Sequence, residues 1–252
     1  MNQPAIVKPC HEKTFQQGKV YCRYQGAKIN NFLPDMFDSH YWQQQQAIVG
    51  SAEGRGTTWF ITTDQAEHGV QHWVLRHYYR GGLIGKVIHD HYFYTGMNNT
   101  RAAREFTLLQ AMQELGLPAP EPVAFRIIKQ GLWYQADLLS TRINNANDLV
   151  ALLSAHAISV SLWQEIGRVI KMFHRHGIYH HDLNAHNILI DDKDKVWLID
   201  FDQGEQRQQQ NKWPAANLAR LLRSFRKENA KLARWHWHED NWQALLQGYN
   251  SN

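Results

Sequence analysis

The distribution of hydrophobic and polar positions divides the chain into a strand-rich first half and a helix-rich second half. Residues 46–62 follow the pattern of a strand, a glycine turn and a second strand, and residues 70–79 form another strand candidate. Two alternating stretches, 123–128 and 132–139, flank Lys129-Gln130-Gly131 and predict a hairpin. The first 45 residues are polar and predict no regular element.

Helical spacing predicts one helix in the first half and most of the second half. Residues 100–115 carry apolar side chains at near-helical spacing, and Gly116 ends that helix. Beyond residue 140 we expect helices around one small hairpin; the helices are 149–153, 159–176 and a last one from Asn217 to near the end, and the hairpin is 187–190 with 196–199.

These patterns predict an α+β fold of two lobes, with an N-terminal antiparallel sheet that carries one helix and a mainly helical C-terminal lobe. The expected organisation is a polar segment of unknown role (1–45), an N-lobe (46–141) and a C-lobe (142–252). The chain has 252 residues, of which 43% are hydrophobic and 20% are charged, so a disordered or coiled-coil protein is excluded. No apolar run is long enough to span a membrane and no signal peptide is recognisable, so we expect a cytoplasmic protein.

Charge and cysteine content exclude only a few kinds of site and partner. The formal net charge is +4, and basic residues concentrate in 71–104 and 207–234. Such patches are either solvated helix faces or sites for an anionic partner, such as a phosphate, a nucleic acid or an anionic membrane surface. Cys10 and Cys22 are the only cysteines, which argues against a disulfide framework and against a zinc site.

The candidate chemistry lies between Ile178 and Gln203. His180-x-Asp182-Leu183 is followed by Asn187, and Asp200 comes thirteen residues after Asn187. Both acids and the amide lie at the edges of two short apolar strands. A hairpin of these strands would bring Asp182, Asn187 and Asp200 around one site.

Phosphoryl transfer needs this set of side chains. Asn187 and Asp200 can supply the oxygen ligands that Mg²⁺ prefers, and Mg²⁺ in turn bridges the phosphates of a nucleotide. Asp182 can orient an acceptor hydroxyl and take its proton. His180 would brace the loop.

The same residues resemble the catalytic and metal-binding loops of the protein kinase-like superfamily. The resemblance implies that Asp182 is the catalytic base, Asn187 the second metal ligand and Asp200 the principal metal ligand. The chain departs from the protein kinases at Asp202, where they have glycine, and it has no Ala-Pro-Glu motif after it. The peptide-binding segment is therefore expected to be absent or rebuilt, which argues against a protein substrate.

The resemblance also implies a nucleotide-covering N-lobe and a catalytic, acceptor-binding C-lobe. The phosphate-covering loop would be formed by Gly50, Gly54 and Gly56, although a plain hairpin turn explains these glycines equally well. Glu105 would be the helical glutamate. Arg76 would stand where the superfamily has a strand lysine, with Lys86 as the alternative.

Longer stretches resemble one branch of this superfamily, the Kdo (3-deoxy-D-manno-octulosonic acid) kinases. They include VLRHYYRGGLIGK, the segment from Thr100 to Ala124, YHHDLNAHNILID and NLARLLRSFRK. The resemblance implies transfer of the ATP γ-phosphoryl group, with Mg²⁺, to the 4-hydroxyl of Kdo on a Kdo-lipid A precursor in lipopolysaccharide assembly. It also implies peripheral association with the cytoplasmic face of the inner membrane. Arg80 and Lys86 could contact the anionic acceptor, or could belong to a plain flexible loop.

The last predicted helix allows two interpretations. Basic residues form one stripe and apolar residues another; the basic ones are Arg220, Arg223, Lys227, Lys231 and Arg234, and the apolar ones are Leu218, Leu221, Leu222, Phe225 and Leu232. This helix could lie on an anionic membrane with Trp235 and Trp237 near the interface, or its apolar stripe could pack into the core.

Other functions remain as alternatives. A heptose or aminoglycoside kinase would use the same Asp182, Asn187 and Asp200 roles. Arg76 in place of lysine would suit a pseudokinase that binds without transfer. The basic, Trp-rich C-terminus would suit a nucleic-acid binder, but no recognised nucleic-acid motif is present, so we expect no nucleic-acid partner.

Overall fold

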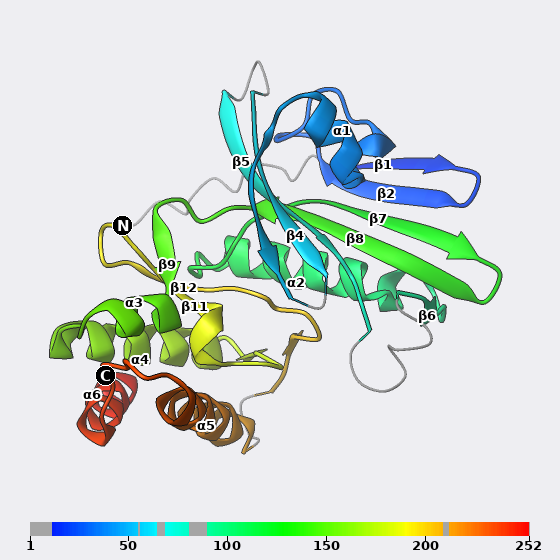
Figure 1. The fold of residues 1–252 in the computed structure, drawn as a ribbon. Helices are drawn as coiled ribbons and strands as arrows, with labels where there is room; N and C mark the ends of the chain where they lie inside the picture. Colours follow the sequence, from blue (N-terminus) through cyan, green and yellow to red (C-terminus); the bar gives the residue numbers. More distant parts are fainter. Residues whose placement is uncertain (1–11, 55, 65–68, 81–89, 209–211, 252) are drawn as a thin grey trace, which may run out of the picture. The chain divides into compact units, whose positions relative to one another are not determined.

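The computed structural model describes residues 12–54, 56–64, 69–80, 90–208 and 212–251, which form two compact units (Figure 1). The first unit holds the described residues up to Gln110 together with Glu121–Arg142. The second holds Ala111–Pro120 and the described residues from Ile143 onward.

An antiparallel sheet forms the framework of the first unit. Its path is β1-β2-β7-β8-β5-β4-β3, and β6 pairs with the part of β8 that β5 does not reach. The strands are β1 (Glu12–Gln17), β2 (Val20–Gln25), β3 (Ile48–Glu53), β4 (Thr57–Asp64), β5 (Val70–His77), β6 (Tyr92–Phe93), β7 (Pro122–Gln130) and β8 (Trp133–Thr141). The α+β class with an antiparallel sheet is thereby confirmed, as is the predicted β7–β8 hairpin.

The prediction that the first 45 residues are irregular is wrong for the residues described from position 12 onward. They form β1, β2, the short helix η1 (Pro34–Phe37) and helix α1 (Ser39–Gln44). The strand signal is weak because β1 is an edge strand with little burial, so no hydrophobic alternation is required of it.

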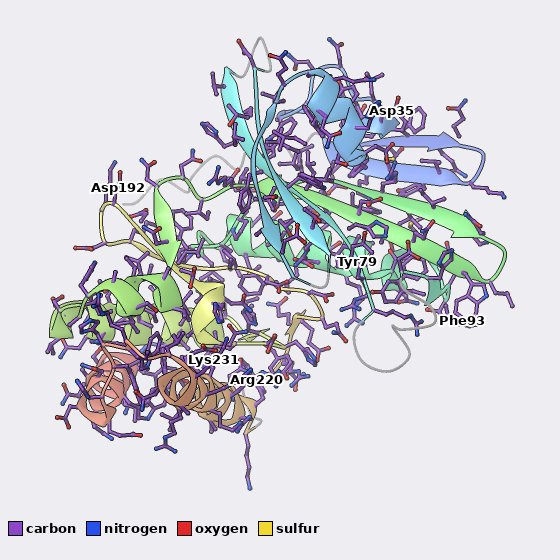
Figure 2. All side chains as sticks on the ribbon, in the orientation of Figure 1. Asp35, Tyr79, Phe93, Asp192, Arg220 and Lys231 are labelled. Carbon is purple, nitrogen blue, oxygen red and sulfur yellow. The ribbon has the colours of Figure 1, made fainter. Side chains whose placement is uncertain are left out.

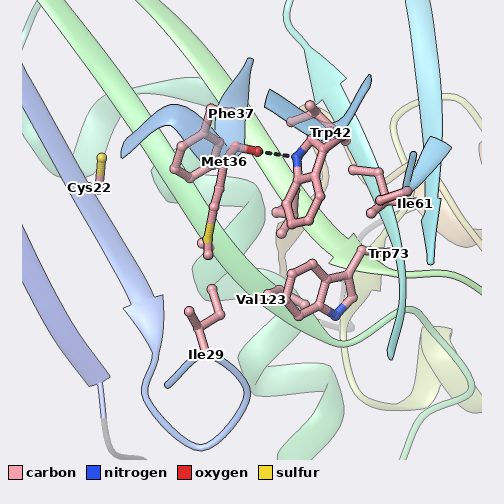
Figure 3. Packing of buried hydrophobic residues seen from close by; sticks show 12 residues of the cluster. Cys22, Ile29, Met36, Phe37, Trp42, Ile61, Trp73 and Val123 are labelled. Atoms are coloured by element: carbon pink, nitrogen blue, oxygen red, sulfur yellow. Dashed lines mark hydrogen bonds between the residues drawn. The ribbon is translucent and has the colours of Figure 1, made fainter. Parts of the chain in front are cut away.

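The same segment supplies a large part of the core of this unit (Figure 3). Met36, Phe37 and Trp42 pack with Trp73 of β5, and the Trp42 indole Nε1–H donates to the Met36 carbonyl oxygen at 2.7 Å. The Trp42 and Trp73 rings meet edge to face with centroids 5.9 Å apart. Residues 29–42 are thus as much a part of the sheet domain as the strands that the sequence predicted.

Strand β7 is buried on both faces. On one face Phe125 meets Phe106 of helix α2 (Arg101–Glu114), with ring centroids 5.2 Å apart. On the other face Arg126 is paired with Asp137 of β8 at 2.8 Å. Asp137 also accepts from the ring of His77, and burial alone would lower the pKa of His77, but the hydrogen bonds and charges of Asp137 and Asp90 raise it. The buried Asp137 carboxylate is tolerated because both Arg126 and His77 donate hydrogen bonds to it.

The second unit is mainly helical around small strands. Its helices in the described residues are α3 (Leu149–Ala155), α4 (Val160–Arg175), α5 (Trp213–Lys231), α6 (Glu239–Asn250) and the short 3-10 helix η4 (Ala185–Asn187). A further 3-10 helix, η3 (Met97–Asn99), belongs to the first unit. Its strands are β9 (Ala146–Asp148), β10 (Ile178–Tyr179), β11 (Ile188–Asp191), β12 (Val196–Leu198) and β13 (Glu205–Gln206). The helices predicted at 149–153 and 159–176 and the small hairpin β11–β12 are confirmed.

Two glycines let α4 and α6 pack backbone to backbone. A Cβ at Gly167 would lie 2.0 Å from the Leu245 carbonyl oxygen, and one at Gly248 would lie 1.9 Å from that of Gln164. Neither position has room for a side chain, because the neighbouring atom is backbone and cannot swing away. Substitution of either glycine would force the two helices apart.

The prediction of one helix from Asn217 to near the end is wrong. Helix α5 ends at Lys231, and an irregular segment leads to α6. This segment returns Trp237 to the core, where its ring stacks on Phe225 with centroids 5.7 Å apart and Trp237 is only 3% exposed. Leu221 and Phe225 are also buried. Leu221 and Phe225 of the apolar stripe therefore pack inside the unit, as the core-packing interpretation of this helix predicts. The alternative, with Trp237 at a membrane interface, is wrong for Trp237.

Acid should weaken the packing of α4 through His174. Burial lowers the pKa of His174 from 6.5 to about 4, and the ring is hydrogen-bonded to the Tyr249 hydroxyl. Because the unfolded chain binds this proton more readily, its contribution to stability is complete above pH 6.5 and is lost as the pH falls toward 4. We expect this loss to reach up to about 3 kcal/mol. Urea unfolding of the protein and of His174→Gln over this range measures it. The substitution should flatten the pH dependence, and equal slopes for the two proteins would contradict the assignment.

Candidate active site

The hairpin β11–β12 brings Asn187 and the residue before Asp200 together. Ile188 pairs with Leu198 in the antiparallel register, and the Ile199 N–H donates to the Asn187 carbonyl oxygen at 3.0 Å. Asp200 follows directly. The sequence places Asn187 at the start of one strand and Asp200 just beyond the other, and the hairpin brings these two ends together.

Asp182 is tied to the same place through its backbone. The Asn187 side-chain nitrogen donates to the Asp182 carbonyl oxygen at 2.9 Å. The Asn184 side chain donates to that same oxygen at 3.0 Å. The loop from Asp182 to Asn187 is thus closed by its own amides, and the three predicted residues lie at one site in the second unit.

His180 is a brace for this loop. It is 3% exposed, and both ring nitrogens are engaged by backbone: Nε2 donates to the Ile199 carbonyl oxygen at 2.9 Å, and Nδ1 accepts from the Asp182 N–H at 3.2 Å. Burial lowers the pKa of His180 below its usual value. A neutral ring with one N–H is the form that satisfies both bonds. The ring therefore connects the start of the loop to the end of β12.

Asp200 adopts a backbone conformation that few residues other than glycine adopt. Its φ is +61°, in the left-handed region, and Phe201 after it is fully buried against Phe173 with ring centroids 5.6 Å apart. Aspartate tolerates this region better than most residues, but the conformation costs free energy and is held by its surroundings. The buried Phe201 anchors the chain directly after Asp200, and Ile199 directly before it is hydrogen-bonded to the Asn187 backbone.

The residues present fit a magnesium ion. Mg²⁺ takes hard oxygen ligands and usually only one or two from protein side chains. The Asp182 carbonyl uses the Asn187 amide nitrogen, which leaves the amide oxygen as the atom to face a cation. In the described part of the chain no three histidine, cysteine, aspartate or glutamate side chains gather into a metal cluster. The candidate donor set is thus one amide and one carboxylate, and phosphate oxygens and water would supply the other ligands of a bound Mg²⁺.

Helix α5 contributes residues to the site that the sequence did not predict. Arg220 donates from Nε at 2.9 Å and from Nη2 at 2.7 Å to Oδ1 of Asp182 (Arg220 is labelled in Figure 2). Asn217, one turn earlier, accepts from the His180 N–H at 3.3 Å and donates to the His180 carbonyl at 3.0 Å. Ser224, one turn later, accepts from the Ala185 N–H at 3.0 Å.

These contacts form one face of α5. Positions 217, 220 and 224 recur at helical spacing, and Glu228 continues the row with an oxygen 3.6 Å from the His186 ring. The sequence analysis put Arg220 on a basic stripe with Arg223 and Lys227. The available signal was the small polar residues Asn217 and Ser224 inside a long helix, because such side chains favour bonds to nearby backbone.

In the first unit the structure brings Arg76 and Glu105 together. The Arg76 guanidinium donates to Oε2 of Glu105, and the Tyr78 hydroxyl donates to the same oxygen at 2.6 Å. Glu105 is 4% exposed, so its carboxylate is desolvated and held by these donors. Lys86, the alternative to Arg76, lies outside the described residues, while Arg80 donates to the His91 carbonyl at 2.6 Å.

The three glycines do not form one loop. Gly50 lies within β3 opposite Phe60, so its predicted place in the turn is wrong. Gly54 and Gly56 do flank the β3–β4 turn, where the Gly54 N–H donates to the Gly56 carbonyl at 3.1 Å. A Cβ on Gly56 would lie 2.0 Å from the Tyr79 ring, so a larger residue would displace that ring.

Comparisons with known proteins agree with the resemblance. A model of the lipopolysaccharide kinase (Kdo/WaaP) family matches residues 39–249. A 3-deoxy-D-manno-octulosonic acid kinase of Vibrio vulnificus is 48% identical over 216 residues, which cover 86% of this chain and 89% of that protein. One of Haemophilus influenzae is 43% identical over 241 residues, which cover 94% and 98%.

None of the helices in the described ranges is both long and apolar enough to cross a membrane. The family match spans most of the sheet and all but the last three residues of the second unit, including the loop with Asp182, Asn187 and Asp200. By this match and by these identities, the chain belongs to the lipopolysaccharide kinase (Kdo/WaaP) family.

Proposed function

We propose that the protein transfers the γ-phosphoryl group of ATP to the 4-hydroxyl of a Kdo residue on a Kdo-lipid A precursor, in lipopolysaccharide core biosynthesis. The observation that carries this proposal is the loop and hairpin that gather Asp182, Asn187 and Asp200 in a chain whose relatives are named Kdo kinases. The proposal includes the two-lobed kinase-like arrangement, which the match to a kinase family supports. It also includes a peripheral position on the cytoplasmic face of the inner membrane, because the proposed acceptor is linked to lipid A.

Asp182 is the residue proposed to handle the acceptor. Arg220 engages Oδ1, so the second carboxylate oxygen is the one to accept a proton from the sugar hydroxyl. As that proton passes to Asp182, a bond forms between the hydroxyl oxygen and the γ-phosphorus. The bond from the γ-phosphorus to the β–γ bridging oxygen breaks, and ADP leaves.

The remaining residues are proposed to bind the nucleotide. Asn187 and Asp200 would hold Mg²⁺, which would neutralise charge on the phosphate oxygens when bound. The turn with Gly54 and Gly56 would lie over the nucleotide phosphates, with the Gly54 N–H closing the turn itself, and Arg76 would bind a phosphate through its guanidinium. Glu105 supports this proposal for Arg76, because the ion pair fixes the direction of the guanidinium.

Mass spectrometry of a Kdo-bearing lipid A precursor, incubated with Mg-ATP and the protein, tests the reaction. We expect a gain of one phosphoryl group, and a fall in kcat of at least about 1,000-fold in Asp182→Asn with nucleotide binding retained. Asp200→Asn should weaken Mg²⁺-dependent nucleotide binding as well, because it removes a metal ligand. Transfer to a heptose or aminoglycoside instead would reassign the acceptor. Nucleotide binding without any transfer would favour a pseudokinase.

Arg220 is expected to act by positioning Asp182. Arg220→Gln should lower kcat by about 10- to 100-fold while the KM for ATP stays within about twofold, because the carboxylate loses its orientation. Arg220→Lys should recover part of the rate. In an Asp182→Asn background the substitution should cost little more, since the two residues act as one unit. Arg223→Gln removes an equal charge from an exposed position on α5 and is the control. Additive losses in the double variant would refute the coupling.

The Arg76–Glu105 pair should be needed for the stability of the first unit. Arg76→Met removes a partner of a buried carboxylate, and we expect it to lower the free energy of unfolding by about 2–4 kcal/mol. Combining it with Glu105→Gln should recover at least half of that loss, because no charge is then buried. Urea unfolding of the single and double variants measures this cycle. A double variant as unstable as Arg76→Met would show that the ion pair is not the cause.

A further inference from the structure

We infer that one end of the sheet is a docking surface for an anionic lipid membrane. The surface, called the sheet tip here, consists of Phe93, Leu132 and Trp133 with Lys19 and Lys129. It adds a membrane contact to the proposed function, whose acceptor is linked to lipid. The contact is assigned to residues of the first unit alone.

Register places the two aromatic residues on one outward face. In the β6–β8 pair, Tyr92 lies opposite Tyr134 and Phe93 lies opposite Trp133. Side chains of opposed residues point to the same side of a sheet, and successive residues alternate. The two tyrosines are buried, at 8% and 3% exposed, so Phe93 and Trp133 must point outward together.

The outward residues are large, apolar and open to solvent. Phe93 is 55% exposed, Leu132 66% and Trp133 40%, and the Phe93 and Trp133 rings meet edge to face with centroids 6.0 Å apart. Figure 2 shows Phe93 near the end of the sheet where the β7–β8 hairpin turns. The Tyr94 N–H donates to the Leu132 carbonyl oxygen at 2.8 Å, which fixes the turn against β6. Scattered apolar residues need no explanation, but a fixed group of three does.

The charge of the tip fits an anionic surface. The Lys129 N–H donates to the Lys19 carbonyl oxygen at 2.9 Å, so two exposed lysines come from neighbouring hairpin ends. Residues 16–20, 92–95 and 128–134 contain these two lysines and no acidic residue. Lys129 lies opposite Tyr134 in the β7–β8 register, and its Nζ is 4.6 Å from the Tyr94 ring centroid, so it points to the face of the sheet away from Trp133. It therefore flanks the apolar group from the other side of the hairpin. A contact through the end of the sheet brings both the rings and this lysine to the boundary between headgroups and acyl chains.

The structure also removes the earlier candidate for membrane contact. The apolar stripe of α5 packs in the core of the second unit through Leu221 and Phe225. With its largest apolar side chain buried in the core, α5 offers less apolar area to a membrane, and interfacial binding depends on that area. The sheet tip has both the apolar side chains and the positive charge.

Flotation with phosphatidylglycerol-containing vesicles, compared with phosphatidylcholine vesicles, tests the inference with the full chain. Lys19→Gln/Lys129→Gln should weaken binding to the anionic vesicles at low salt by about 25-fold, or about 5-fold for each lysine. Arg223→Gln/Lys227→Gln makes the same change of charge on α5 and is the matched control. If the α5 variant loses binding and the tip variant keeps it, the inference is wrong.

The apolar part of the tip is tested separately. Leu132→Asp changes the most exposed residue of the turn, so folding should be intact, and we expect it to weaken binding by at least about tenfold. Val70→Asp, at a residue that is 60% exposed on β5, is its control. Quenching of tryptophan fluorescence by brominated lipids should fall in Trp133→Phe, which keeps the apolar ring.

The outcomes separate this inference from the proposed reaction. Flotation needs neither ATP nor the sugar acceptor, so failure of phosphoryl transfer would leave the tip result standing. Absence of vesicle binding by the unmodified chain would overturn the inference. So would equal binding of Leu132→Asp and Val70→Asp, or self-association that the tip substitutions abolish, since the tip would then be a protein contact.

Discussion

The contact between Arg220 and Asp182 ties the chemistry of this protein to a long helix. A carboxylate on a short polar loop has two rotatable bonds and no fixed direction of its own. Two N–H groups from one guanidinium remove that freedom at Oδ1, and the other oxygen is the one that the proposed reaction assigns to the acceptor. Asn217 and Ser224 hold the backbone on either side of Asp182, so α5 positions both the loop and the side chain.

This arrangement explains why the site tolerates costly features. Asp200 has a left-handed backbone, and His180 is a buried polar ring beside two acids. Each feature would be destabilising alone, but its neighbours hold it in place. The buried Phe201 fixes the backbone after Asp200, and two hydrogen bonds to backbone satisfy the His180 ring. The loop is therefore preorganised before any substrate binds, which is what phosphoryl transfer needs from a protein.

Much of the fold and part of the site could be predicted from the sequence. Elements with strong periodicity, such as α2, α4 and the β7–β8 hairpin, follow from their own residues. The edge strand β1 and the core residues of 29–42 do not, because an exposed edge needs no alternation and a tertiary core is not a local pattern. Asp182, Asn187 and Asp200 were predictable because a hairpin joins them within 19 residues. Arg220 was not, because its partner lies 38 positions away.

Basic residues show most clearly where sequence reasoning stops. Arg76, Arg126 and Arg220 each pair with a carboxylate of their own unit, so that carboxylate offsets much of their charge. Lys19 and Lys129 are exposed at neighbouring hairpin ends that contain no acidic residue. A run of basic residues in the sequence does not show which cations are paired with a carboxylate and which are exposed without one, because both kinds contribute equally to the count of lysine and arginine. The partner of each cation decides its role, and that partner is known only from the fold.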